Sequence, residues 1–143
     1  MADVFTPEKR SEVMSRVRGK DTKPERIVRS MLHRLGYRFT IKGPGNRRLP
    51  GRPDLVIPRH RTVIFVHGCF WHAHENCEFF RLPKTRRAWW RRKLEGNRQR
   101  DLRNQRDLTT AGWNVVTIWE CCLKSEGDRR WLRNRLPKLI GIP

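Results

Sequence analysis

The sequence has few acidic residues and no long apolar segment. Its 143 residues include 33 Lys and Arg but only 14 Asp and Glu, which gives a formal net charge of +19. No run approaches the roughly 18 apolar residues of a membrane-spanning helix, and the N-terminus lacks the apolar centre of a secretory signal peptide. We therefore expect a cytoplasmic protein with reduced thiols and no membrane association.

The positive charge is carried mainly by arginine and is spread along the whole chain. Of the basic residues, 25 are Arg and 8 are Lys. Arginine forms bidentate hydrogen bonds with phosphate and guanine. A highly charged, solvated surface is the simpler interpretation, but surfaces tuned for solubility usually mix both signs. The excess therefore favours nucleic acid as the partner over acidic lipid, because the basic residues do not form one terminal cluster.

Hydrophobic periodicity and turn residues predict one α/β domain over residues 1–143, with the element order α-β-β-β-α-β-α. The expected fold is a mixed central sheet flanked by helices, and residues 1–20 are expected to form an N-terminal arm against DNA. The predicted segments are a capped helix over 22–36, strands over 37–41, 54–57, 62–66 and 113–119, a loop over 43–53, a long helix over 85–112 and a terminal helix over 128–139.

A group of cysteine and histidine residues follows the strand at 62–66. Cys69, His74 and Cys77 lie within nine residues, and thiolates with an imidazole suit zinc. Cys121 is the natural fourth ligand of a tetrahedral site, although the cysteines in its segment can equally be ordinary buried thiols. His72 and His74 compete for the ligand role on sequence alone, and the histidine left free is suited to move protons.

One acid, Asp54, stands at the head of an apolar run. Phosphodiester hydrolysis needs charge stabilisation at the phosphate and an activated water, and Mg²⁺ held by a few carboxylates supplies both. Glu25 and Asp101 are candidates to bind the outer waters of such an ion. Each acid also has a simpler interpretation: Glu25 completes a helix capping box, Asp101 pairs with nearby arginines, and Asp54 caps a turn after Pro53.

Aromatic residues lie both in the His/Cys segment and in the long basic helix. Phe70 and Trp71 stand between candidate ligands, and Trp89 and Trp90 are flanked by arginines and a lysine. Apolar side chains among basic residues can wedge into a base stack, and core packing is the alternative. Because adjacent helical residues cannot share a face, we expect one of Trp89 and Trp90 to face the core and the other not to.

Taken together, these residues resemble the Vsr family, the very-short-patch-repair DNA mismatch endonucleases. The resemblance extends over most of the chain and leaves only the tail after Cys122 unconstrained. The matching motifs are RSEVMSRVRGKDTKPE (Arg10–Glu25), LPGRPDLV (Leu49–Val56), VIFVHGCFWHAHENC (Val63–Cys77), the N-x-x-R-D pattern that ends at Asp101, and GWNVVTIWEC (Gly112–Cys121).

The resemblance implies a type II restriction-endonuclease core with a catalytic Mg²⁺ ion. Asp54 corresponds to the catalytic aspartate that binds this ion, and Val66 to a residue that binds it through the backbone carbonyl. The best-known members carry Thr at the position of Val66, and a carbonyl ligand tolerates that difference. Glu25, His67 and Asp101 correspond to catalytic residues that organise metal waters and phosphate.

The resemblance also implies how the histidines divide their roles. His72 corresponds to the catalytic histidine. The implied ligands of a structural Zn²⁺ ion are then Cys69, His74, Cys77 and Cys121, in a segment whose AHEN sequence is less rich in histidine than that of the family and one residue longer.

The implied DNA contacts are mainly aromatic. Phe70, Trp71 and Trp90 correspond to residues that wedge into DNA, and we group Met14 and Arg52 with them as DNA-contacting residues. The implied substrate is double-stranded DNA with a T·G mismatch.

The resemblance implies a bacterial monomer that nicks DNA on the 5′ side of the mismatched thymine. Such a mismatch arises when 5-methylcytosine is deaminated, so a functional link to a cytosine-5 DNA methyltransferase and to other repair proteins is expected. Two alternatives remain: a zinc-stabilised DNA-binding protein without catalytic activity, and a related nickase with a different target. Asp54 distinguishes an enzyme from the first alternative, because a pure binding module has no need of an acid near the phosphate path.

Overall fold

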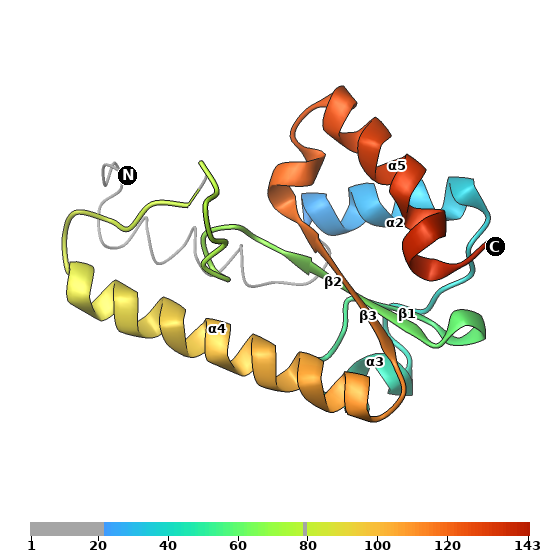
Figure 1. The fold of residues 1–143 in the computed structure, drawn as a ribbon, viewed down its shortest axis with the longest axis horizontal. Helices are drawn as coiled ribbons and strands as arrows, with labels where there is room; N and C mark the ends of the chain where they lie inside the picture. Colours follow the sequence, from blue (N-terminus) through green and yellow to red (C-terminus); the bar gives the residue numbers. More distant parts are fainter. Residues whose placement is uncertain (1–21, 79) are drawn as a thin grey trace.

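The computed structural model describes residues 22–78 and 80–143 (Figure 1). The predicted N-terminal arm and Met14 therefore lie outside the described residues. The elements are α2 (Lys23–Leu35), α3 (Pro44–Arg48), β1 (Leu55–Ile57), η1 (Pro58–His60), β2 (Thr62–His67), α4 (Arg87–Thr110), β3 (Asn114–Trp119), η2 (Glu120–Leu123) and α5 (Glu126–Ile140). None of the helices in this part of the chain combines the length and apolar character that crossing a membrane requires.

The sheet is mixed, three-stranded and ordered β1-β2-β3. β1 and β2, which match the strands predicted over 54–57 and 62–66, form an antiparallel hairpin in which Leu55 is opposite Ile64. β3 runs parallel to β2, so that Val63 is opposite Val115 and His67 is opposite Trp119. The parallel pairing places the ends of β2 and β3 side by side, although they are 52 positions apart in sequence.

The strand expected over residues 37–41 is the main error in the predicted fold. This segment contributes a single bridge, in which Thr40 and Val56 exchange backbone hydrogen bonds of 2.9 and 3.0 Å. The chain then turns at Gly43 into α3, a short helix where a loop was predicted, so the pairing cannot continue. Four predicted strands thus become three strands and one bridge.

Helices cover both faces of the sheet, with α2 and α5 on one side and α4 on the other (Figure 1). Along β2, side chains alternate between the faces: Ile64 packs in the core with α2 and α5, whereas Val63 and Phe65 pack with Leu108 of α4. β3 lies at the edge of the sheet, and only Val116 and Ile118 of this strand are buried.

The predicted limits of α2 are confirmed by its caps. The hydroxyl of Thr22 accepts a hydrogen bond from the backbone N–H of Glu25 at 3.4 Å, and Gly36 ends the helix with a φ of 97°. This start fixes Glu25 in the first helical turn, where the helix meets the end of β2. The terminal helix begins at Glu126, two residues before its predicted start, because Ser125 caps it.

Candidate active site and metal centre

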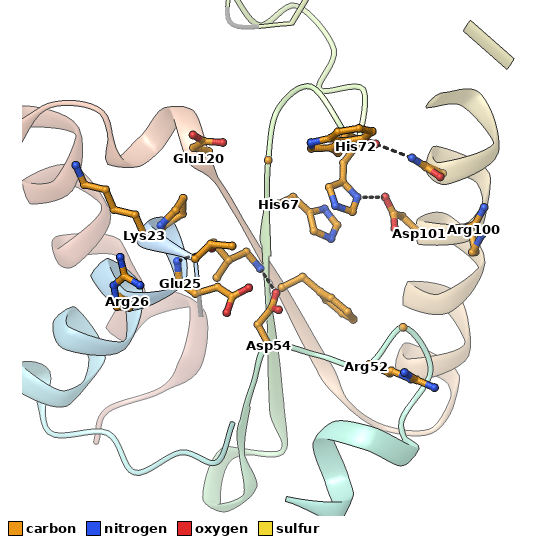
Figure 2. A pocket seen from close by; sticks show the side chains of 18 of the residues that line it. Lys23, Glu25, Arg26, Arg52, Asp54, His67, His72, Arg100, Asp101 and Glu120 are labelled. Carbon is orange, nitrogen blue, oxygen red and sulfur yellow. Dashed lines mark hydrogen bonds and ion pairs between the residues drawn. The ribbon is translucent and has the colours of Figure 1, made fainter. Parts of the chain in front are cut away.

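A cleft of about 830 Å³ opens between the first turn of α2, the end of β2 and the middle of α4 (Figure 2). All five residues predicted to be catalytic line this cleft, although they come from four separate segments. They are Glu25, Asp54, His67, His72 and Asp101. The fold therefore brings together acids and imidazoles that are up to 76 positions apart in sequence.

Asp54 and Glu25 form a carboxylate pair on the α2 side of the cleft (Figure 2). The Oδ2 atom of Asp54 accepts a hydrogen bond from the backbone N–H of Val66 at 2.7 Å. Burial, reinforced by the neighbouring carboxylate of Glu25, raises the pKa of Asp54 to about 7. Two neighbouring carboxylates repel each other when both are ionised, and a bound cation would relieve that repulsion. The donor set therefore fits Mg²⁺, which prefers carboxylate oxygens and retained waters.

His72 and Asp101 form a hydrogen-bonded pair on the opposite side of the cleft. The Nδ1 atom of His72 lies 2.5 Å from Oδ2 of Asp101, which projects from α4. The amide of Asn97, one turn earlier on α4, donates to the backbone carbonyl of Trp71 at 3.0 Å and holds the loop in place. With Nδ1 paired to the carboxylate, Nε2 is the ring nitrogen left to exchange a proton with a substrate.

His67 supports His72 from below. The two imidazole rings stack in parallel with their centroids 3.7 Å apart and an interplanar angle of 2°. Burial, followed by the proximity of His72, lowers the pKa of His67 to about 3, so this ring is neutral. Its Nδ1 atom is buried and has no hydrogen-bond partner among the described residues.

The stacked imidazoles are poorly arranged to hold one metal ion, although their nitrogens and a carboxylate oxygen of Asp101 lie within 4.8 Å of one another. A metal ion binds an imidazole nitrogen in the plane of the ring. Parallel rings offer two separate planes, so a single ion cannot lie in both. The geometry favours proton transfer by His72 over metal binding by the pair.

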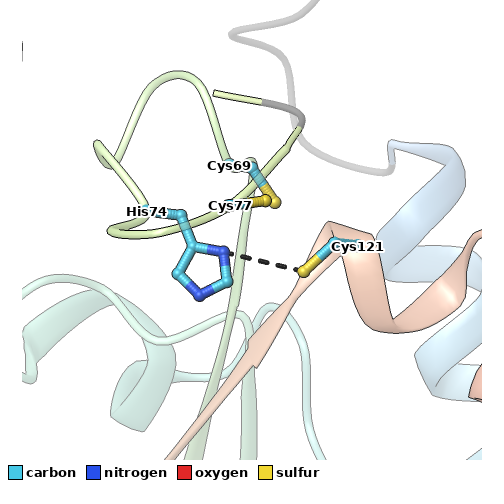
Figure 3. Close-up of side chains that lie close together, drawn as sticks. All are labelled: Cys69, His74, Cys77 and Cys121. Carbon is cyan, nitrogen blue, oxygen red and sulfur yellow. Dashed lines mark hydrogen bonds between the residues drawn. The ribbon is translucent and has the colours of Figure 1, made fainter. Parts of the chain in front are cut away.

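Four soft ligands form a second cluster beside the cleft (Figure 3). Cys69, His74 and Cys77 come from the loop after β2, and Cys121 comes from η2, directly after the parallel neighbour β3. Their donor atoms all lie within 4.8 Å of one another, and Sγ of Cys121 is 3.6 Å from Nδ1 of His74. Tetrahedral zinc with ordinary bond lengths would place sulfur and nitrogen about 3.6 Å apart.

The electrostatics of this cluster also favour a cation. Burial raises the pKa values of Cys69 and Cys121, and the proximity of the other thiols raises that of Cys121 further. Burial lowers the pKa of His74, which keeps its imidazole neutral and available as a ligand. The cluster is consistent with a zinc site. It contains His74, whereas His72 pairs with Asp101, as the family resemblance implies.

Trp119 forms a wall shared by the cluster and the cleft. Its ring stacks on His74 at 3.9 Å with an interplanar angle of 6°, and it meets His67 edge-on at 5.3 Å. Its side chain is only half-buried, although the residue lies at the end of a strand. Its position directly before Glu120 and Cys121 in the sequence was the signal that could have placed Trp119 at the site.

Three aromatic residues form a cluster, of which Trp71 lines the cleft. Trp90 lies 5.4 Å from Phe70 and 6.0 Å from Trp71, measured between ring centroids. As predicted, only one residue of the adjacent tryptophan pair is buried: Trp90 is 5% exposed and Trp89 is 39% exposed. Trp90, the buried residue, is the one assigned to DNA contact, and in this structure its ring packs against Phe70 and Trp71.

Arg52 lies at the cleft in a left-handed backbone conformation, with a φ of 50°. The preceding Gly51 has a φ of 77°, and a Cβ atom there would lie 3.1 Å from the ring of Phe65. Such conformations persist in residues other than glycine only where the surroundings impose them. The turn thus holds an exposed guanidinium at the opening of the cleft.

Sequence reasoning missed several polar residues of the cleft. Lys93, Asn97 and Arg100 line it together with Asp101. Their spacing of three and four places them on one face of α4, so helical periodicity offered a signal for these residues. Lys23, Arg26 and Glu120 also line the cleft, and only the arrangement of the chain in space brings these residues there.

Comparison with known proteins gives the family. The model of the DNA mismatch endonuclease Vsr family matches residues 2–78. The chain is 47% identical over 127 residues to the type II nicking enzyme V.XorIIP of Xanthomonas oryzae, covering 89% of this chain and 90% of that protein. It is 39% identical over 140 residues to the type II nicking enzyme V.NmeAIP of Neisseria meningitidis, covering 98% and 97%.

A third relative is the DNA mismatch endonuclease Vsr of Escherichia coli. The identity is 41% over 124 residues, which cover 87% of this chain and 77% of that protein. Acids and imidazoles across one cleft, a thiol-rich cluster beside it and these three relatives agree. The chain belongs to the Vsr family of DNA mismatch endonucleases and type II nicking enzymes, and it is a DNA nicking endonuclease.

Proposed function

We propose that this enzyme hydrolyses the phosphodiester on the 5′ side of the thymine in a T·G mismatch and so starts very short patch repair. The observation that carries the proposal is the cleft that holds the Asp54–Glu25 pair opposite the His72–Asp101 pair, with Trp71 in its wall. The relative from Escherichia coli, which is named as a DNA mismatch endonuclease, supports the target.

Asp54 and the backbone carbonyl of Val66 are the proposed ligands of Mg²⁺. When bound, this ion stabilises charge on the phosphate and lowers the pKa of a coordinated water. Asp54 is held for this role by its hydrogen bond from the N–H of Val66. Glu25, beside it, orients the outer waters of the site.

His72 transfers the proton of the attacking water at the scissile phosphate, as general base or as relay. Asp101 holds Nδ1 of His72 at 2.5 Å and stabilises the imidazolium that forms. His67 stacks on this ring and fixes its plane, and its buried Nδ1 atom is free to bind an ordered water.

The DNA contacts are proposed from the shape and charge of the cleft. Phe70 and Trp71 wedge into the stack at the mismatch, Trp90 supports them, and Arg52 binds the backbone. Met14 is proposed on the resemblance alone. A wobble pair is weakly stacked, so the wedge costs less there than in matched DNA.

The Cys/His cluster is proposed to hold one structural Zn²⁺ ion. Four ligands complete a tetrahedral site and leave no open position, so the ion stabilises the loop after β2 and takes no part in cleavage. We further propose that the enzyme acts as a monomer in the bacterial cytoplasm, at the nucleoid. Its functional partners are a cytosine-5 methyltransferase and other repair proteins.

A related nickase with a different target is the second candidate, because two of the relatives are named only as type II nicking enzymes. The deciding experiment measures nicking of duplexes that carry a T·G mismatch, another mismatch or a matched pair, with and without Mg²⁺. The proposal expects a nick 5′ of the thymine, only in the T·G duplex and only with the metal. Equal nicking of another mismatch would support the second candidate.

A further inference from the structure

The loop before Asp54 is built around a buried polar side chain, that of Asn46 on α3. Asn46 is 0% exposed. Its Oδ1 atom accepts a hydrogen bond from the hydroxyl of Thr40 at 2.7 Å. Its Nδ2 atom donates to the backbone carbonyls of Thr40 at 2.9 Å and Pro53 at 3.2 Å. Because a buried amide without partners is costly, these three bonds fix the side chain in one orientation.

The two carbonyls that accept hydrogen bonds from Asn46 are both close to Asp54 along the backbone pairing. Pro53 directly precedes Asp54, and Thr40 is paired with Val56, two residues after it. β1 itself begins one residue after Asp54, so the ladder with β2 does not fix the backbone of this aspartate. The Asn46 side chain supplies the restraint that the ladder lacks.

The stretch between Asn46 and Asp54 needs such a restraint. Gly51 and Arg52 both have positive φ angles, of 77° and 50°, and Arg52 lies two residues before Asp54. A strained arginine relaxes unless the structure on both sides of it is held. Relaxation there would displace the carboxylate of Asp54 from the N–H of Val66.

We propose that Asn46 is a positioning residue that holds Asp54 in the geometry required to bind a divalent cation. This inference rests on the proposed function, in which Asp54 is a ligand of Mg²⁺. Side chains that orient a metal ligand typically change metal affinity by about 10- to 100-fold when they are removed. Asn46 acts one step further back, through the backbone, so the lower end of that range is expected.

The test measures metal binding directly as well as activity. The zinc-loaded full chain is bound to a pre-nicked T·G duplex and titrated with Mn²⁺, and the free ion is followed by electron paramagnetic resonance. Asn46→Ala is expected to weaken Mn²⁺ binding by about tenfold and to raise the Mg²⁺ concentration for half-maximal nicking equally. The zinc content should not change. Thr40→Val, which removes one of the three bonds, should have a smaller effect in the same direction.

Thr62→Val is the matched control. Thr62 is also 0% exposed; its hydroxyl donates to the carbonyl of His60 at 3.0 Å and accepts from Asn114 at 3.1 Å, at the far end of β2. The Thr62→Val substitution should lower thermal stability without weakening Mn²⁺ binding. If Asn46→Ala binds Mn²⁺ as tightly as this control does, the positioning role is refuted.

The remaining outcomes are also decisive. If Asn46→Ala does not fold, Thr40→Val decides, and an unchanged Mn²⁺ affinity in that variant overturns the inference. A wild-type protein that fails to nick an intact T·G duplex in the presence of Mg²⁺ refutes the proposed function. The Mn²⁺ titration would then still test whether Asn46 positions Asp54.

Discussion

The two clusters at the end of β2 are built in opposite ways. The Cys/His cluster closes on itself, because four donor atoms from two chain segments lie within 4.8 Å of one another. The Asp54–Glu25 pair offers two carboxylates to a cleft of about 830 Å³. A closed set of soft ligands is typical of a structural zinc site, and an open set of oxygen ligands of a catalytic ion that keeps its waters.

The same physical cause acts on both clusters. Burial raises the pKa of Asp54 to about 7, and it raises the pKa values of Cys69 and Cys121. In each place the fold gathers groups that resist ionisation until a cation shares their charge. Burial therefore favours cation binding at both clusters, and the number of protein ligands decides whether a position is left open for substrate.

The largest expected effect comes from removing the open site. Asp54→Ala should reduce Mg²⁺-dependent nicking at least about 10⁴-fold, beyond the loss expected for one acid–base group. DNA binding should stay intact or become tighter, because a negative charge near phosphate is lost. Single-turnover nicking and a binding titration check this. Substantial residual nicking with normal zinc content would show that Asp54 has no catalytic role.

The next prediction separates two histidines of one loop. His72→Ala should keep zinc and bind mismatched DNA but lose about 10²- to 10⁴-fold in nicking rate, the usual range for acid–base groups. His74→Ala should instead lose zinc and thermal stability. Each variant is the control for the other, measured by metal analysis and nicking. Exchanged phenotypes would mean that the roles of ligand and catalyst must be swapped.

The sequence predicted the parts of this site that depend on local pattern. The capping residues fixed the start of α2 and hence the place of Glu25, and the apolar run after Asp54 placed this residue next to β1, which begins at Leu55. The same holds for the long helix that presents Asp101. Periodicity and turn chemistry are short-range signals, and these elements follow them.

Other features depended on contacts that no local pattern encodes. Residues 37–41 alternate like a strand, yet only Thr40 pairs, because α3 follows directly. Asn46 is polar and lies in a segment rich in Gly and Pro, which indicated an exposed loop rather than a buried amide. The shared wall at Trp119 required the parallel pairing of β2 and β3 to be known.

The closed site is broken by removing one ligand. Cys121→Ser should lose the zinc ion and several kcal/mol of stability, because metal binding contributes folding free energy. Cys122→Ser is the matched control: this neighbour lies outside the ligand cluster and should be dispensable. Metal analysis and thermal unfolding measure both variants. Zinc retained at one equivalent in Cys121→Ser would exclude this cysteine as a ligand.

Burial of Asp54 in the open site should make the free energy of unfolding depend on pH. The folded-state pKa of Asp54, about 7, lies above its ordinary value of 3.8. This residue therefore destabilises the metal-free fold increasingly as pH rises toward 7, and Asp54→Asn removes that cost. The stabilisation by Asp54→Asn should grow by about 2 kcal/mol between about pH 5.5 and about pH 8.5.

Denaturant unfolding without added Mg²⁺ measures this difference at each pH. Asp107→Asn, on the exposed face of α4, is the control for the loss of one negative charge. A stabilisation by Asp54→Asn that is the same at both pH values would show that burial does not disfavour the charged carboxylate.

The smallest expected effect concerns discrimination by the aromatic wall. Trp71→Ala should lose about 1–3 kcal/mol of binding free energy for a T·G duplex, the range for one base stacked on an aromatic ring. The loss for matched DNA should be smaller, because opening a well-stacked pair already costs more than the contact returns. Trp131→Ala is the control, since Trp131 is 54% exposed on α5, outside the cleft lining. Binding titrations at one salt concentration compare both variants on both duplexes. Equal losses on the two duplexes would mean that Trp71 only packs, and that the open site does not itself read the mismatch through this residue.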